Sequence, residues 1–291
     1  MKQIIGTGLS GLVGSRIVEL LGSEYSFEDV SRKTGTDITD KDAVLSRIQA
    51  SSSPVVLHFA AYTDVETAEK EKDLGEESSA WKINVEGTKN IVEACKATKK
   101  KLIALSTDMV FPGEKELPGK YIEDDRRGPT NWYATTKYEA EKVIQDSDIA
   151  WSILRIAYPY RAHFTKNDSV RIFLSKLRNH EPIRAVTDHY FTPTFIDDLA
   201  PIIDLFIRED HFGIFHAPGA KAFSPFEIAT MVAKSFDLDE SLISEVTRAE
   251  FFQGRAERPF NLSLSSAKIE SLGVKLHSLS EAIEILKEQN A

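Results

Sequence analysis

The sequence predicts an α/β protein built on a doubly wound parallel sheet of the Rossmann type, followed by a smaller α/β lobe. Two observations predict this class. Short apolar runs bounded by turn residues alternate with longer amphipathic stretches in the first half of the chain, and a glycine-rich loop directly follows the first apolar run. Strands that alternate with helices need crossover connections, which produce a parallel sheet covered by helices on both faces.

Four apolar runs have the pattern of strands buried inside a parallel sheet, over residues 3–5, 55–59, 102–106 and 151–155. Apolar residues at helical spacing predict helices among them, over residues 10–21, 79–97 and 133–144. The order strand, helix, strand therefore repeats, as the Rossmann architecture requires.

The composition narrows the class of protein. Of the 291 residues 42% are hydrophobic, which is enough for a sizeable core, and 36 basic against 45 acidic residues give a net charge of −9, which disfavours nucleic acid as a partner. The single cysteine, Cys95, excludes an intramolecular disulfide and a cysteine-rich zinc site, and no metal site is predicted. Neither a signal peptide nor an apolar run long enough to span a membrane is found in the sequence, so the cytoplasm is the expected location.

Gly8, Gly11 and Gly14 stand three residues apart between the first strand and the first helix. The first permits a tight turn, the second lets backbone amides approach a pyrophosphate at the helix N-terminus, and the third lets the helix pack on the strand. The position between a strand and a helix is the context that this motif requires. The loop therefore predicts a dinucleotide cofactor, NADP or NAD.

The end of the second strand bears on the choice of cofactor, and two interpretations stay open. If the strand ends at Val30, then Ser31 and Arg32 face the ribose, together with the next lysine, and can hold a 2′-phosphate, which favours NADP. If the strand ends earlier, Asp29 can bind the ribose hydroxyls of NAD. We prefer NADP, with simple solvation of the two cations as the alternative.

After about residue 156 the alternation weakens, and prolines and aromatic residues become frequent. Helical patterns over residues 225–236 and 279–287 follow without long strands between them. We therefore expect an NAD(P)-binding domain over residues 1–156 and a mainly substrate-binding lobe over residues 157–291, with an approximate boundary and interleaved segments. A broad interface between them would hold a ligand cleft.

Tyr133 and Lys137 are four residues apart at the start of a predicted helix, so they lie on one helical face. A phenol normally titrates near pH ~10, and a neighbouring cation lowers its pKa toward a useful range for proton transfer. Thr107 ends a predicted strand at the sheet edge where ligands bind, and its hydroxyl can polarise a substrate carbonyl while Tyr133 supplies a proton. Asp108 fits a turn and a substrate contact equally well.

Together these motifs resemble the extended short-chain dehydrogenase/reductases. Further segments are similar, in order and spacing, to one branch of them, the dTDP-4-dehydrorhamnose reductases. These segments are residues 60–63 (Ala-Ala-Tyr-Thr), 106–111 (Ser-Thr-Asp-Met-Val-Phe), 129–137 (Pro-Thr-Asn-Trp-Tyr-Ala-Thr-Thr-Lys), 192–194 (Thr-Pro-Thr) and 258–259 (Arg-Pro). The resemblance covers essentially the whole chain.

The resemblance implies roles for particular residues. The catalytic residues would be Thr107, Tyr133 and Lys137, with Lys137 also on the nicotinamide ribose. NAD(P) would further contact Gly11, Leu12, Val13, Ser31, Asp37, Ile38, Ala60, Ala61 and Tyr62. A nucleotide-linked sugar would contact Thr107, Asp108, Tyr158, Thr194 and Arg258.

The chain departs from the family pattern in two places. Met109 stands where the family usually has tyrosine, and residues 155–158 read Arg-Ile-Ala-Tyr where the family usually has Arg-Thr-Ser-Trp. That tryptophan lies at the sugar in the family. Tyr158 keeps an aromatic surface but adds a hydroxyl, so the identity of the sugar stays open while the chemistry does not.

We therefore expect reduction of a keto group on a nucleotide-linked 6-deoxysugar by NADPH or NADH. Two alternatives stay open. The regulatory β subunit of methionine adenosyltransferase resembles the same branch and works by association, and a sugar-nucleotide epimerase would keep its NAD bound. The sequence does not fix the oligomeric state, for which a homodimer is considered.

Overall fold

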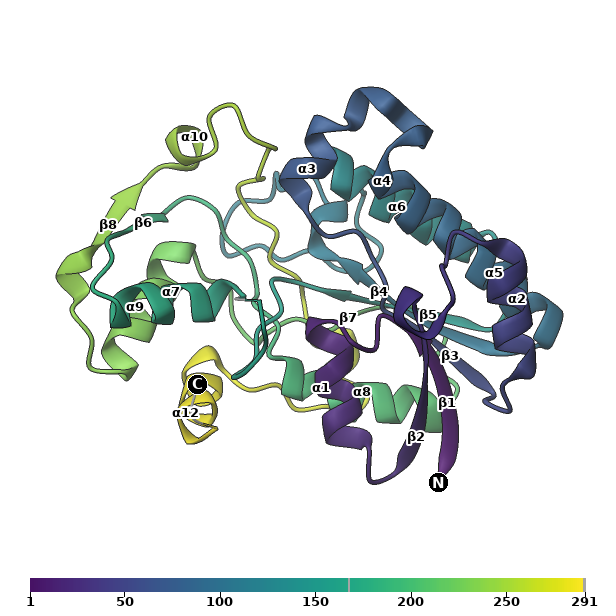
Figure 1. Ribbon diagram of the computed structural model, residues 1–291. Helices are drawn as coiled ribbons and strands as arrows, with labels where there is room; N and C mark the ends of the chain where they lie inside the picture. Colours follow the sequence, from purple (N-terminus) through teal and green to yellow (C-terminus); the bar gives the residue numbers. More distant parts are fainter. Residues whose placement is uncertain (167, 290–291) are drawn as a thin grey trace.

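The computed structural model describes residues 1–166 and 168–289, and in this part of the chain a six-stranded sheet forms the centre of the molecule (Figure 1). In spatial order its strands are β2 (Tyr25–Val30), β1 (Lys2–Thr7), β3 (Val55–His58), β4 (Lys101–Thr107), β5 (Trp151–Ile156) and β7 (Gly213–His216). Each neighbouring pair runs parallel. The doubly wound parallel sheet that the sequence predicts is confirmed.

Helices cover both faces of this sheet. On one face α1 (Leu12–Leu21) lies beside α8 (Ile196–Arg208), and the other face carries α2 (Lys41–Ala50), α5 (Gly87–Thr98) and α6 (Trp132–Gln145) (Figure 1). Alternate strand residues enter the two layers: Ile4, Leu57, Ile103 and Leu154 on the α1 side, and Ile5, Val56, Leu102 and Ile153 on the α5 side. Burial on both faces explains why the strands read as continuous apolar runs.

Gly8 and Gly14 shape the turn from β1 into α1. Gly8 has a φ of 68°, a left-handed conformation that residues with a side chain rarely adopt. A Cβ on Gly14 would lie 2.3 Å from the carbonyl oxygen of Gly8 and 2.6 Å from Cα of Leu9. Because neither position accepts a side chain, the glycine spacing lets α1 start close to the end of β1.

The helix expected over residues 79–97 is interrupted by a π-helical turn. The chain forms α4 (Ser79–Trp81), the π-helical residues Lys82–Glu86, and then α5. Within the π-helical turn, the Asn84 side chain accepts a hydrogen bond from the Tyr62 amide at 2.8 Å and donates to the Thr136 hydroxyl at 2.9 Å. The widened turn thus joins the loop after β3 to α6, a long-range contact that apolar periodicity does not encode.

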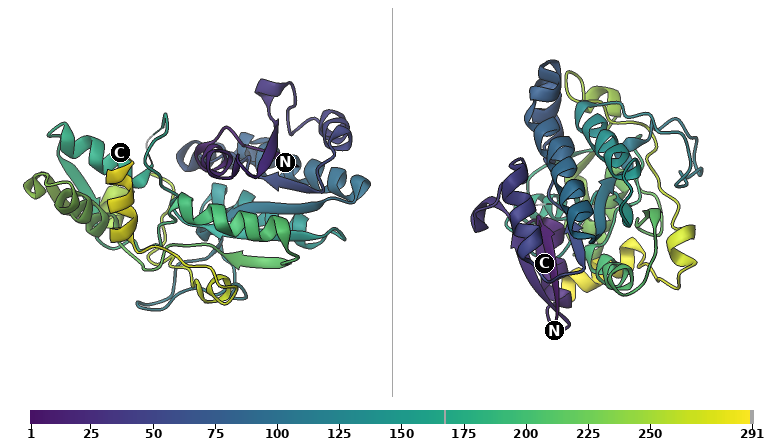
Figure 2. Two further views of the ribbon diagram at one scale, coloured as in Figure 1. Left: turned by 90° about the horizontal axis from the view of Figure 1, so that it is seen from below. Right: turned by 90° about the vertical axis from the view of Figure 1, so that its right-hand side faces the viewer.

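The second lobe contains a two-stranded parallel sheet, β6 (Ile183–Val186) and β8 (Ile243–Val246), packed with α7 (Ser169–Arg178), α9 (Pro225–Ser235) and α12 (Leu279–Glu288). Shorter helices are α3 (Val65–Lys70), α10 (Arg248–Phe251) and α11 (Ala267–Glu270). Figure 2 shows this lobe beside the sheet domain. Residues from both sides of the expected boundary build the sheet domain, since α8 and β7 follow residue 157 in the chain.

Across the described residues, the structure has no helix with the length and apolar character needed to cross a membrane.

Candidate active site

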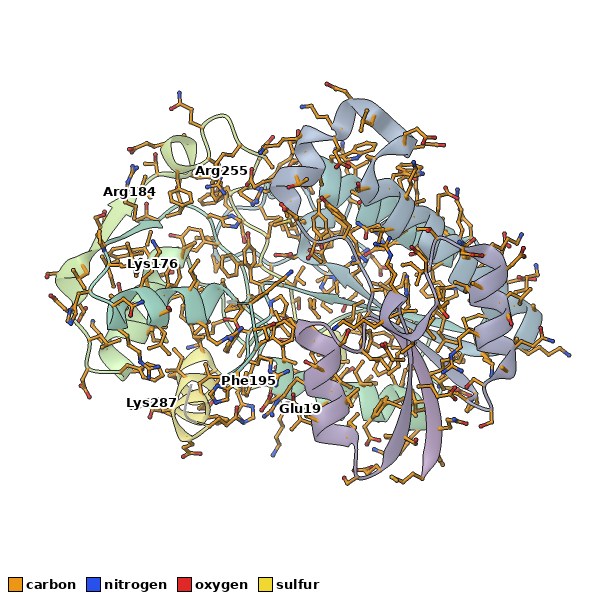
Figure 3. The ribbon with its side chains drawn as sticks, in the orientation of Figure 1. Glu19, Lys176, Arg184, Phe195, Arg255 and Lys287 are labelled. Atoms are coloured by element: carbon orange, nitrogen blue, oxygen red, sulfur yellow. The ribbon has the colours of Figure 1, made fainter. Side chains whose placement is uncertain are left out.

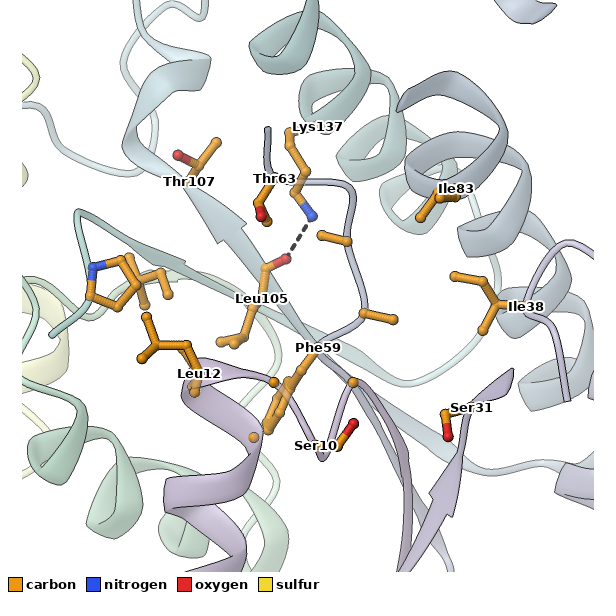
Figure 4. Close-up of a pocket in the computed structure, with 18 of the residues that line it drawn as sticks. Ser10, Leu12, Ser31, Ile38, Phe59, Thr63, Ile83, Leu105, Thr107 and Lys137 are labelled. Carbon is orange, nitrogen blue, oxygen red and sulfur yellow. Dashed lines mark hydrogen bonds between the residues drawn. The ribbon is translucent and has the colours of Figure 1, made fainter. Parts of the chain in front are cut away.

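A cavity of about 840 Å³ follows the carboxyl ends of the central strands, where open parallel sheets bind ligands (Figure 4). Residues 164–166, from the loop that leads into α7 of the second lobe, line another part of its wall. The cavity brings together most residues of the expected site: Gly8, Gly11, Leu12, Val13, Gly14, Ser31, Arg32, Asp37, Ile38, Ala60, Ala61, Thr107, Asp108, Tyr133, Lys137 and Tyr158.

The N-terminus of α1 faces the cavity through Gly11, Leu12 and Val13. Among the side chains that the structure describes, none caps this helix end, and its first turn carries no acidic residue. The backbone N–H groups of that turn are therefore available to an anion, and the helix dipole adds positive potential. This end of the cavity fits the pyrophosphate of a dinucleotide.

The next part of the wall follows β2, which ends at Val30. The side chain of Arg32 is 71% exposed, and its Nε donates to Oδ2 of Asp37 at 2.7 Å. Asp29 is not among the described residues that line the cavity, and its carboxylate accepts a hydrogen bond from the Ser31 hydroxyl at 2.6 Å. Two interpretations were open for the end of this strand. The structure agrees with the one in which the strand ends at Val30, which favours a 2′-phosphate.

The chemical end of the cavity lies where β4 meets the start of α6. Thr107, the last residue of β4, donates its hydroxyl proton to Oδ1 of Asp108 at 2.9 Å. Tyr133 stands in the first turn of α6, and one helical turn later the Lys137 ammonium donates to the Leu105 carbonyl at 3.0 Å (Figure 4). The sheet edge and one helical face therefore bring a hydroxyl, a phenol and an amine to the same wall.

Burial controls the protonation of these groups. It raises the pKa of the Tyr133 phenol, as does the nearby Asp108 carboxylate, while the neighbouring Thr107 hydroxyl opposes the rise. Burial also lowers the pKa of Lys137 to about 8, against the influence of Glu141. The net lowering of the Tyr133 pKa that we expected from Lys137 is therefore not found, because removal of the phenol from water dominates.

Asp108 is the third buried titratable group at this end. Its Oδ2 atom has no hydrogen-bond partner among the described residues. Burial raises the pKa of this carboxyl to about 7, although the Thr107 hydroxyl favours the charged form. Near neutral pH the group is thus close to the balance between a hydrogen-bond donor and an acceptor.

Three expected site residues are not among the residues that line the cavity. Thr194 is buried, and its hydroxyl accepts from the Ala157 amide at 3.0 Å and donates to the Ala217 carbonyl at 2.9 Å, which joins the ends of β5 and β7. Tyr62 lies beside Asn84 of the π-helical turn. The third residue is Arg258.

Arg258 sits beyond the cavity wall, next to Tyr158. Its Nη2 donates to Oε1 of Glu66 at 3.0 Å, and its Nη1 donates to the Ala256 carbonyl at 3.0 Å. Burial and the Asp108 carboxylate raise the pKa of the Tyr158 phenol, and the positive charge of Arg258 opposes that rise. The arginine therefore links α3 of the sheet domain to the second lobe behind a residue of the cavity wall.

The cavity is also lined by residues that were not predicted from the sequence to contact a ligand. These are Ser10, Phe59, Thr63, Val65, Ile83, Pro159, Phe164, Thr165 and Lys166 among others. Phe59 directly follows β3, so its strand-end position was a usable signal. Ile83 lies in the π-helical turn and residues 164–166 lie in an irregular loop, where local sequence carries no such signal.

The fold and this wall define the class of the protein: an extended short-chain dehydrogenase/reductase, with a glycine turn at one end of the cavity and threonine, tyrosine and lysine at the other. The chain belongs to the RmlD substrate binding domain family, whose model matches residues 1–290.

Individual relatives agree with this assignment. A dTDP-4-dehydrorhamnose reductase of Aggregatibacter actinomycetemcomitans is 29% identical over 282 residues, covering 93% of this chain and 92% of that protein. The crystal structure of a dTDP-4-dehydrorhamnose reductase from Bacillus anthracis in complex with NADP has a TM-score of 0.89 and 29% identity, and the match covers 99% of this chain and 100% of that one. The methionine adenosyltransferase 2 subunit beta of Pongo abelii is 25% identical, covering 94% of this chain and 83% of that protein.

Proposed function

We propose that this protein reduces the keto group of a nucleotide-linked 6-deoxysugar, as a dTDP-4-dehydrorhamnose reductase does, with NADPH or NADH as the reductant. One observation carries the proposal: a single cavity joins the uncapped N-terminus of α1 to Thr107, Tyr133 and Lys137. The chain is an NAD(P)-dependent oxidoreductase of the reductase branch, in agreement with its relatives.

When bound, the reduced nicotinamide supplies the hydride to the substrate carbonyl carbon. The chain's own residues hold the ligands: the first-turn amides of α1 receive the pyrophosphate, and Lys137 receives the nicotinamide ribose. Arg32 and Ser31 receive a 2′-phosphate, which is supported by the end of β2 at Val30 and by the NADP in the related Bacillus anthracis structure. NADP is therefore the preferred cofactor.

Protonation of the carbonyl oxygen falls to Tyr133. Its raised pKa keeps the phenol protonated at neutral pH, so the proton is present when negative charge develops on the substrate oxygen. Thr107 donates its hydroxyl proton to Asp108 in the structure, and the same proton can turn to the substrate oxygen and stabilise its charge. Lys137, with a pKa of about 8, remains largely charged at pH 7 and stabilises the phenolate that is left.

The test is turnover of dTDP-4-dehydrorhamnose, followed by the absorbance of the reduced nicotinamide, with NADPH and NADH in parallel. We expect consumption of NADPH, and slower or weaker use of NADH. Tyr190→Phe is the matched control for a Tyr133→Phe variant, because it removes a phenol hydroxyl from a residue that is not among those lining the cavity.

A second function has one specific observation in its favour, the 25% identity with the methionine adenosyltransferase 2 subunit beta. Cofactor binding without turnover on a panel of keto-sugar nucleotides would favour that regulatory role over reduction. NAD that stays bound through purification, with no net consumption, would favour an epimerase. A cytoplasmic location and a homodimer stay predictions.

A further inference from the structure

Tyr158 occupies an unusual place in the cavity wall. It follows the end of β5 with a φ of 42°, a left-handed conformation that is uncommon for a residue with a side chain. Its ring stacks on Phe191 with centroids 3.7 Å apart, and its hydroxyl lies 2.8 Å from Nε2 of His189. Stacking and hydrogen bonding together hold this side chain in one orientation.

The direction of the hydrogen bond follows from the other side of the imidazole. Nδ1 of His189 lies 2.6 Å from the carbonyl oxygen of Pro259, and a carbonyl oxygen can only accept. Nδ1 therefore carries the ring proton, and Nε2 presents its lone pair to Tyr158. His189 is 1% exposed, and burial lowers its pKa to about 4, so the ring is neutral in this arrangement at physiological pH. The hydroxyl proton of Tyr158 is consequently committed to His189.

This arrangement fixes what Tyr158 can offer to a ligand. A phenol has one proton and two lone pairs, so once its proton is committed its oxygen can only accept. Tyr158 lines the cavity together with Thr107, Asp108 and Tyr133, so a ligand bound at the chemical end of the cavity can approach this acceptor.

We propose that Tyr158 is a specificity-determining residue and that His189 is its positioning residue. Together they present a fixed hydrogen-bond acceptor that selects a sugar with a hydroxyl group on the ring carbon beside the reacting carbonyl. This inference rests on the proposed function, because it takes the cavity to hold a keto sugar.

The experiment compares two nucleotide-linked 4-keto-6-deoxysugars, one with the 3-hydroxyl and one 3-deoxy, in the full-length protein. The measured quantity is the ratio of their kcat/KM values. Tyr158→Phe keeps the stacking ring but removes the acceptor, so the preference for the hydroxylated sugar should fall roughly tenfold, while the rate with the deoxy sugar changes little. Tyr190→Phe should leave the ratio unchanged.

Two variants of His189 separate positioning from simple structural support. His189→Gln can keep an acceptor for the Tyr158 proton, and it should retain the ratio within about twofold. His189→Leu frees that proton and the orientation of the phenol. A sugar hydroxyl can also accept from Tyr158, so the ratio should fall, but by less than in Tyr158→Phe. Nitrogen NMR of the wild-type imidazole should show a proton on Nδ1 and none on Nε2.

An unchanged ratio in Tyr158→Phe, or a proton on Nε2 of His189, would overturn the inference. Failure of the proposed function gives a different result, since wild-type protein would then reduce neither sugar. In that case, equilibrium binding of the same two compounds to the protein tests the inference about Tyr158. A hydroxyl preference that Tyr158→Phe abolishes supports the fixed acceptor, and equal binding of both compounds by the wild type overturns it.

Discussion

Arg155 donates hydrogen bonds to both carboxylate oxygens of Glu141, with Nε–Oε1 and Nη2–Oε2 distances of 2.8 and 2.7 Å. Both side chains are buried, Arg155 on β5 and Glu141 on α6. Glu141 follows Lys137 by one helical turn and raises its pKa, against the effect of burial. The pair thus joins the helix that carries Tyr133 and Lys137 to the central sheet.

Glu141→Gln should lower the free energy of unfolding by about 3–5 kcal/mol, because the change leaves a buried guanidinium without its counter-charge. Unfolding in urea measures the effect. Glu139→Gln is the matched control, since it loses an ion pair with Lys142 that is partly exposed, and should cost less than about 1 kcal/mol. An equally small effect for Glu141→Gln would show that other contacts of Arg155, such as the Glu123 carbonyl, are sufficient.

Tyr133→Phe should leave folding and cofactor affinity intact while turnover falls by roughly 10²–10⁴, which is the usual contribution of a positioned general acid. The ring stays in the first turn of α6, so packing is preserved. Single-turnover rates and cofactor titration measure the two effects separately. Near-normal turnover with unchanged cofactor affinity would exclude the role of Tyr133 as the proton donor.

A Thr107→Val variant, made alone and together with Tyr133→Phe, tests whether the two hydroxyls act on the same substrate atom. Both hydroxyls are expected to act on one substrate oxygen, so the double variant should lose less activation free energy than the two single losses summed. Strictly additive losses would mean that Thr107 and Tyr133 act on different atoms.

Arg32→Asp should weaken NADPH binding by at least about tenfold and NADH binding far less, because a cation that faces the 2′-phosphate becomes a repelling anion. Fluorescence titration with both reduced cofactors measures the difference. Arg184→Asp is the control: this arginine lies on β6 of the second lobe and pairs with Glu250 at the surface (Figure 3). Equally small changes with both cofactors would show that Arg32 only faces solvent.

The parts of the fold and site that the sequence predicts are those set by local spacing. Gly8 and Gly14 specify a strand-to-helix turn through backbone geometry alone, and the four-residue spacing of Tyr133 and Lys137 specifies a helical face. Thr107 is placed by the end of an apolar run, because carboxyl ends of parallel strands share one edge.

The features of the site that the sequence does not predict depend on contacts between residues far apart in the chain. The family resemblance predicts Thr194 as a substrate residue, but its hydroxyl bonds to the backbones of Ala157 and Ala217, whose positions only the folded chain fixes. The pKa of Tyr133 depends on how completely the phenol is buried, which the neighbouring lysine in the sequence does not reveal. The link from Tyr158 to His189 likewise spans 31 residues.

Asp108→Asn should change the pH dependence of stability. Burial raises the pKa of Asp108 from 3.8 to about 7, so between these pH values the folded protein holds a proton that the unfolded chain has released. The unfolded state therefore binds fewer protons, and the contribution of Asp108 to the free energy of unfolding falls as the pH rises from about 4 to about 7. Above pH 7 the folded protein carries the buried carboxylate at its full cost, on the order of a few kcal/mol.

Asparagine keeps an acceptor for the Thr107 hydroxyl but does not titrate. The Tm of Asp108→Asn relative to wild type should consequently be higher at pH 8 than at pH 5, as measured by thermal unfolding at both values. Asp210→Asn, which alters an exposed carboxylate at the surface, should give nearly the same Tm difference from wild type at both pH values. A pH-independent difference for Asp108→Asn as well would mean that Asp108 is already ionised at pH 5, and that the neighbouring Thr107 hydroxyl and backbone amides offset its burial.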